Sequence, residues 1–178
     1  EGYDADLIVQ RVAAATREVL AGRALFERDS VLFHQPDYRY PVVAALLRAA
    51  SLNDGVLEVV DFGGSLGSTF RQCRPLLDGL RRLRWHVVEQ PQFVAMGQRQ
   101  FTTEELSFVS SLDELPAANV APLVLLSSVL QYLESPDRTL AEVTSVRPSH
   151  LLIDRTPVSD LDEHRLCVQH VPEAIYAA

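Results

Sequence analysis

The chain has 178 residues, 47% of them hydrophobic, which is enough to bury the core of one soluble domain. Its formal net charge of −8 argues against a nucleic-acid partner, because phosphate binding needs a basic face. No apolar run has the length of a membrane span, and nothing resembles a signal peptide. Cys73 and Cys167 lie far apart and form no metal-binding or disulfide pattern. We therefore expect a cytoplasmic protein without a metal site.

The hydrophobic pattern predicts helices alternating with strands. Helices are expected over residues 5–26, 42–50, 69–83, 93–100 and 136–146, and strands over 57–62, 85–89, 106–109, 123–127, 151–154 and, last, 166–171. Residues 27–41 are expected to form an ordered loop, and Pro75 is expected to disturb its helix. The central strands are continuous apolar runs, typical of strands covered on both faces. This predicts a doubly wound, mostly parallel α/β fold, with a helical cap (1–54) and a Rossmann-like core (55–178) in a single domain.

The first predicted strand ends in an acid and runs into a glycine-rich turn with the spacing acid-x-Gly-Gly-x-x-Gly, from Asp61 to Gly67. Glycine permits positive φ and lets the backbone approach a ligand closely. The spacing differs from the Gly-x-Gly-x-x-Gly of dinucleotide folds, and it resembles the first motif of class I S-adenosylmethionine (SAM) methyltransferases. A turn that only lets a helix pack closely on the strand would look similar, so both interpretations stay open.

In doubly wound sheets, ligands bind beyond the carboxyl ends of the strands. The second predicted strand ends at Glu89, whose carboxylate can accept both hydroxyls of a ribose; a solvated loop acid is the alternative. The third strand ends in two serines that suit the edge of an adenine. By this rule the predicted cofactor-binding residues are Asp61, Gly63, Gly64, Ser65, Gly67, Glu89, Gln90, Ser110, Ser111, Ser127 and Ser128.

Five segments carry a closer resemblance: residues 27–33, 61–68, 85–90, 127–133 and 154–157. In this order they resemble a family of bacterial class I methyltransferases without an established substrate, sometimes met near surface-polysaccharide genes. The resemblance covers nearly the whole chain and implies SAM as the cofactor, with Gly63, Gly64 and Gly67 along its methionine part and Glu89 on its ribose.

Class I methyltransferases add a helix and an antiparallel hairpin after the fifth strand, but only 24 residues follow Asp154. We therefore expect an incomplete C-terminal hairpin. Because the sequence begins at Glu1 rather than at a methionine, we also expect it to be a fragment. An uncovered sheet edge could pair with a second copy, which would make a homo-oligomer.

Methyl transfer from SAM requires alignment of the acceptor and, for a hydroxyl, removal of a proton. The candidate catalytic residues are His34, Gln131, Tyr132, Asp154 and Arg155. Four of them have a structural alternative: an exposed loop histidine for His34, a packing side chain for Tyr132, and an ion pair between Asp154 and Arg155 that only orders the loop. Of the other histidines, His86 is interpreted as structural and His150 as a strand-boundary residue.

Several methyltransferase subclasses are disfavoured. The fourth strand is not followed by an Asn-Pro-Pro-aromatic clamp for nucleobase amines, and no Pro-Cys nucleophile or metal-binding cluster is present. The sequence thus predicts a SAM-dependent methyltransferase acting on a small-molecule or carbohydrate (saccharide) acceptor, with oxygen favoured on the family's gene context. The alternatives left open are a catalytically inactive methyltransferase-like binding or scaffold module and, with less support, a nicotinamide-dependent oxidoreductase.

Overall fold

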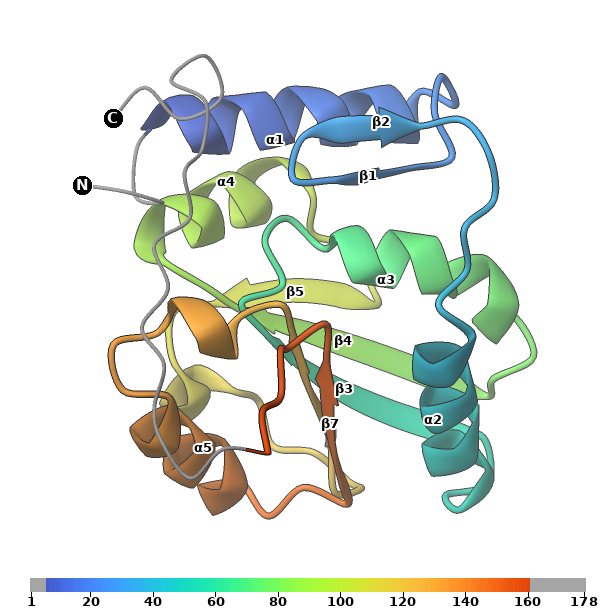
Figure 1. Cartoon of the computed structure of the whole chain (residues 1–178). Helices are drawn as coiled ribbons and strands as arrows, with labels where there is room; N and C mark the ends of the chain where they lie inside the picture. Colours follow the sequence, from blue (N-terminus) through green and yellow to red (C-terminus); the bar gives the residue numbers. More distant parts are fainter. Residues whose placement is uncertain (1–5, 161–178) are drawn as a thin grey trace.

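A computed structural model describes residues 6–160 of the chain. Its centre is a parallel sheet with the strand order β5-β4-β3-β6-β7 (Figure 1). The strands are β3 (Val56–Phe62), β4 (Arg82–Val88), β5 (Leu106–Val109), β6 (Leu123–Ser127) and β7 (His150–Asp154). The chain starts the sheet in the middle, builds one half outward and then returns to the other side of β3, which creates the switch point of a doubly wound sheet. The predicted mostly parallel, Rossmann-like α/β fold is therefore confirmed.

The two faces of the sheet are covered unequally. Successive strand residues point to opposite faces, so Val59 and Val60 belong to different core clusters. The larger cluster joins the Val59 face to four helices: α1 (Asp6–Leu20), α2 (Tyr40–Ser51), α3 (Ser68–Cys73) and α4 (Pro91–Gln100). The Val60 face packs on α5 (Pro136–Ser145) and on the short 3₁₀ turns η2 (Leu112–Glu114) and η3 (Leu130–Tyr132). The second face thus has a thinner cover, made largely of loops.

Two helices end earlier than the hydrophobic pattern predicts. α1 stops at Leu20 rather than residue 26, because Gly22 has a φ of +72°, a left-handed conformation typical of the residue after a helix. α3 stops at Cys73 and continues only as the 3₁₀ turn η1 (Arg74–Leu77). The reason is Pro75, which has no N–H to donate and whose ring clashes with the preceding helical turn.

The predicted loop over residues 27–41 is wrong in its first half, where the structure has a β-hairpin. β1 (Phe26–Arg28) pairs antiparallel with β2 (Val31–Phe33), and the terminal phenylalanine rings stack with centroids 4.6 Å apart. Asp29 and Ser30 close the hairpin with φ values of 51° and 64°. Positive φ at both central residues is what a type I′ turn requires. Strands of three residues are too short to show alternation, which is why the sequence pattern missed them.

The hairpin turn allows a stability test. Ser30→Gly is expected to raise the free energy of unfolding by about 0.5–1 kcal/mol, because glycine adopts positive φ without the steric cost that serine pays. Ser30→Ala is the control, since it removes the same hydroxyl but keeps the Cβ atom. Urea denaturation of both variants measures the difference. A gain in the alanine variant equal to that in the glycine variant would contradict the backbone explanation.

The predicted strand at 166–171 and the expected C-terminal hairpin lie outside the described residues. Among residues 6–160, no helix combines the length and apolar character needed to cross a bilayer. The same part of the chain holds no group of three or more His, Cys, Asp or Glu side chains placed to bind a metal ion.

Candidate functional site

The glycine turn lies where β3 ends and α3 begins, at the carboxyl end of the sheet (Figure 1). Gly63 has a φ of +72°, and its N–H donates to the carbonyl oxygen of Val88 at the end of β4 (2.9 Å). A Cβ atom on Gly63 would lie 2.6 Å from Cγ2 of Val129, and one on Gly64 would lie 2.5 Å from the carboxyl carbon of Asp61. Packing within the protein therefore requires both glycines, and their place beside a cofactor stays a prediction.

Asp61 holds the turn against the neighbouring strand. Its side chain is buried, and its carboxylate accepts a hydrogen bond from Nε1 of Trp85 at 3.0 Å. Burial raises the pKa of Asp61 to about 7; the Trp85 hydrogen bond opposes this rise, and the nearby charge of Glu89 adds to it. Asp61 thus changes its charge close to neutral pH.

Glu89 follows β4 and contacts the glycine turn directly. Its carboxylate accepts the N–H of Gln90 at 2.6 Å, and the backbone N–H of Ser65 lies near enough to favour its charged form. Burial raises the pKa of Glu89, and the N–H groups of Gln90 and Ser65 partly offset this. The structure therefore brings the ends of the first two sheet strands together at Asp61, Ser65 and Glu89, as the strand-end rule predicts.

The predicted adenine side lies next to Glu89. The N–H of Glu89 donates to the carbonyl oxygen of Val109, the last residue of β5 (3.1 Å). Ser110 and Ser111 follow directly, and the N–H of Ser110 donates to Oε2 of Glu114 at 3.0 Å. The ends of three neighbouring strands thus form one continuous polar edge.

A second cluster of polar side chains connects the ends of β6 and β7 to the N-terminal part of the chain. The Ser127 hydroxyl donates to Oδ2 of Asp154 at 3.0 Å and accepts from Nη1 of Arg39 at 2.9 Å. Arg39 also forms an ion pair with Asp154, and their side chains are only 16% and 17% exposed. Burial lowers the pKa of Arg39, which the charge of Asp154 opposes. We call these three residues the Arg39 clamp.

The Arg39 clamp changes two conclusions drawn from the sequence: the ion-pair partner of Asp154, and the set of residues in the candidate site. The partner of Asp154 is Arg39 rather than its sequence neighbour Arg155. Sequence reasoning missed Arg39 because it belongs to no motif and only the fold brings it to Ser127, 88 residues further along the chain.

Strained backbone marks the same end of β6 and β7. Ser128 and Arg155 have φ values of 59° and 52°, and the N–H of Ser128 donates to the carbonyl oxygen of Asp154 at 2.9 Å. The Gln131 side chain joins them, donating to Oγ of Ser128 (3.0 Å) and to the carbonyl oxygen of Arg155 (3.3 Å). Each such non-glycine conformation costs about 1 kcal/mol or more, and these conformations are typical of ligand-binding sites.

Hydrogen bonds and ion pairs among the described residues connect some of the five predicted catalytic residues but not all of them. Gln131 contacts Arg155 and, through Ser128, the chain next to Asp154, while Tyr132 follows in η3 with 49% of its surface exposed. His34 is exposed in the segment after β2, and no hydrogen bond or ion pair within residues 6–160 connects it to Asp154 or Gln131. The structure groups the candidates around β6 and β7 and leaves His34 apart.

No family model and no curated protein matches the chain. Among solved structures, it is similar to a complex of the Haloferax volcanii Trm112 methyltransferase activator with a methyltransferase (22% identity, 62% of this chain, TM-score 0.37). It is also similar to human N-acetylserotonin methyltransferase with SAM (23%, 58%, 0.41) and to SAM-bound CalS10, an amino pentose methyltransferase from Micromonospora echinaspora (14%, 65%, 0.42). The chain spans 56%, 30% and 47% of those three chains. The fold assignment rests on the strand order of the sheet itself.

Proposed function

We propose that this chain is a SAM-dependent methyltransferase domain. The observation that carries the proposal is that the glycine turn after β3 and Glu89 after β4 lie at adjoining strand ends, which are joined by the Gly63 N–H donating to the carbonyl oxygen of Val88 (2.9 Å). A nucleotide cofactor needs a close backbone turn and an acid for its ribose at adjoining strand ends, and the fold supplies both. Bound SAM would supply a methyl group on a positively charged sulfur.

The hydrogen-bonding groups along this edge of the sheet fit SAM. A carboxylate has about four lone-pair sites, and the N–H of Gln90 uses one of those on Glu89, so enough remain for two ribose hydroxyls. In the proposed complex, the turn of Gly63, Gly64 and Gly67 follows the methionine part. Ser110, Ser111 and Gln90 lie on the adenine side, and Ser127 and Ser128 complete the edge.

We place the acceptor, a small molecule or saccharide methylated on oxygen, against the ends of β6 and β7. Support comes from the polar groups gathered there, which suit an acceptor with several hydroxyls, and from the strained residues Ser128 and Arg155. The Arg39 clamp holds the Asp154 carboxylate in one orientation, where it can accept the acceptor's proton. Gln131, Tyr132 and Arg155 would orient the acceptor, and His34 stays the alternative base.

Calorimetric titration of SAM, its demethylated product and NAD tests the cofactor. Glu89→Gln keeps the size of the side chain but removes its charge, and we expect it to weaken binding of SAM or its product about tenfold or more. Glu104→Gln, an exposed acid outside the site, is the matched control and should bind as the unchanged protein does. Binding of NAD with no binding of SAM would instead support a nicotinamide-dependent oxidoreductase.

One observation favours the inactive scaffold as a second candidate. The Cβ positions of Gly63 and Gly64 are blocked by the protein's own atoms, so these glycines need no ligand to explain them. If folded protein binds neither SAM nor its product, the scaffold interpretation replaces the proposed enzyme.

A further inference from the structure

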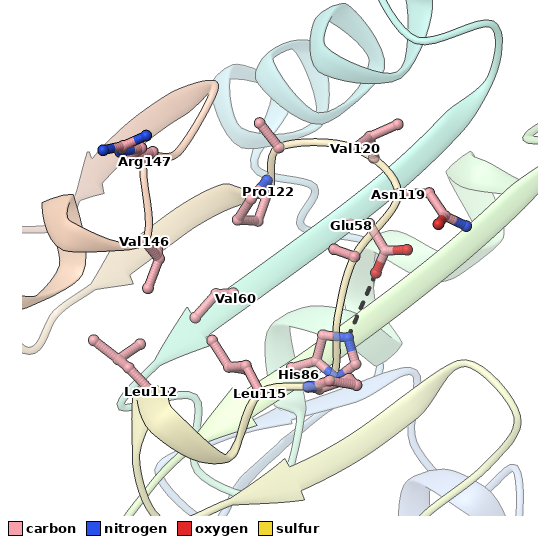
Figure 2. A pocket seen from close by; sticks show the side chains of 13 residues that line it. Glu58, Val60, His86, Leu112, Leu115, Asn119, Val120, Pro122, Val146 and Arg147 are labelled. Atoms are coloured by element: carbon pink, nitrogen blue, oxygen red, sulfur yellow. Dashed lines mark ion pairs between the residues drawn. The ribbon is translucent and has the colours of Figure 1, made fainter.

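A pocket of about 420 Å³ lies on the thinly covered face of the sheet, and no residue of the glycine turn lines it. Figure 2 shows the side chains that line this pocket. Its walls are mostly apolar, with Val60, Leu112, Leu115 and Val146 among them. The outer wall, residues 115–122, has no helix or strand and can move without breaking a regular hydrogen-bond ladder. No element of the proposed function uses this pocket.

One end of the pocket holds a buried carboxylate. The Glu58 side chain is only 1% exposed, and neither of its oxygens accepts a hydrogen bond from the described residues. Oε2 lies 3.5 Å from Nε2 of His86, and Oε1 lies 3.9 Å from Nη2 of Arg82. These are ion-pair distances, too long for good hydrogen bonds. A buried carboxyl group in this state is costly, because it has lost water without gaining hydrogen-bond partners.

His86 does not supply the hydrogen bond that the Glu58 carboxyl group lacks. Its Nδ1 lies 2.7 Å from the hydroxyl of Ser107, which orients the ring with Nε2 toward Glu58 (Figure 2). Burial lowers the pKa of His86, although the nearby Glu58 carboxylate opposes the change. At 3.5 Å, the contact of Nε2 of His86 with Glu58 is longer than a good hydrogen bond. Arg82 is 35% exposed and partly hydrated, which weakens its pairing.

We propose that this pocket binds a small molecule with an amidinium or guanidinium head and an apolar body. Such a head is planar and presents two parallel N–H donors, the geometry that a carboxylate accepts best. Both oxygens of Glu58 are buried, so the head reaches them only when the loop wall of residues 115–122 moves. The apolar body would lie against Val60, Leu112 and Leu115. Arg147 is exposed at the opposite end of the pocket, so its charge faces solvent rather than the head (Figure 2).

Benzamidine, benzamide and benzoate are suitable probes, because they share one ring and differ in the charge of the head. Titrations followed by ¹H–¹⁵N NMR should show benzamidine shifting the amides of Val60, Leu115 and Val146, with at least about tenfold weaker binding for neutral benzamide and none for benzoate. Glu58→Gln should weaken benzamidine binding about tenfold or more. Leu115→Trp should block it by filling the pocket while leaving Glu58 in place.

Glu142→Gln is the matched control, because it removes an acid on α5 that is paired with Arg138 outside the pocket. Binding that survives in this variant and is lost in the other two supports the proposal. Equal affinity for benzamide, unchanged binding in Glu58→Gln, or no shifts with benzamidine would each overturn it. The readout needs no SAM, so its failure is separate from failure of the proposed function.

Discussion

Gly64→Ala is expected to lower the free energy of unfolding by about 1–3 kcal/mol, the usual cost of overpacking a close-packed site. The new Cβ atom would lie 2.5 Å from the carboxyl carbon of Asp61 and 2.6 Å from its Oδ2. Asp61 is buried and hydrogen-bonded to Trp85, so it cannot turn into solvent to make room. Urea denaturation of the purified variant measures the loss.

Gly79→Ala is the matched control, because the same substitution there meets no atom within 4 Å. It should be neutral or slightly stabilising, since alanine restricts the unfolded chain more than glycine does. In an Asp61→Ala background, Gly64→Ala should cost clearly less, because the clashing group is gone. Equal costs in both backgrounds would refute the clash as the cause.

Asp61→Asn is expected to stabilise the protein more at high pH than at low pH. The folded pKa of about 7 lies above the ordinary value of 3.8, so between these values the folded state binds more protons than the unfolded state. Stability contributed by this group therefore falls as pH rises through the window. From pH 5 to pH 8 the loss is about 2–3 kcal/mol. Asparagine resembles the neutral carboxyl and can still accept the Trp85 hydrogen bond, so it escapes the loss.

The measurement is the difference in unfolding free energy between Asp61→Asn and the unchanged protein across this pH range. Glu27 and Glu89 also have raised pKa values, and both remain in the two proteins, so the difference reports Asp61 together with its electrostatic interaction with Glu89. Asp113→Asn, at an exposed acid, is the control and should give a flat difference. A flat difference for Asp61→Asn as well would mean that this carboxylate is not desolvated.

The sheet could be predicted from the sequence because each strand is marked by the hydrophobic pattern of its own residues. Strand β6 is a continuous apolar run that ends at Ser127, and β3 is apolar except at Glu58 and Asp61; this pattern predicts a parallel sheet covered on both faces. The meeting of Glu89 with the glycine turn followed from the same rule, since carboxyl ends of neighbouring parallel strands share one edge.

Features that depend on distant contacts could not be predicted. Arg39 reaches Asp154 only after the whole sheet has formed, and Glu58 has no partner that its sequence neighbours reveal. The β-hairpin was not predicted for a further reason: its Asp29–Ser30 turn adopts positive φ without the glycine that usually signals such a turn. Sequence patterns report propensity and periodicity, whereas these features follow from tertiary packing.

The Arg39 clamp has a consequence for the order of folding. It joins a residue near the start of the chain to the last strand of the described sheet, so it closes one of the longest loops in the fold. Closing such a loop costs entropy that only a nearly complete structure repays, so we expect the clamp to form after the rate-limiting step of folding. Loss of the clamp, for example in Arg39→Ala, is then expected to speed unfolding more than it slows folding.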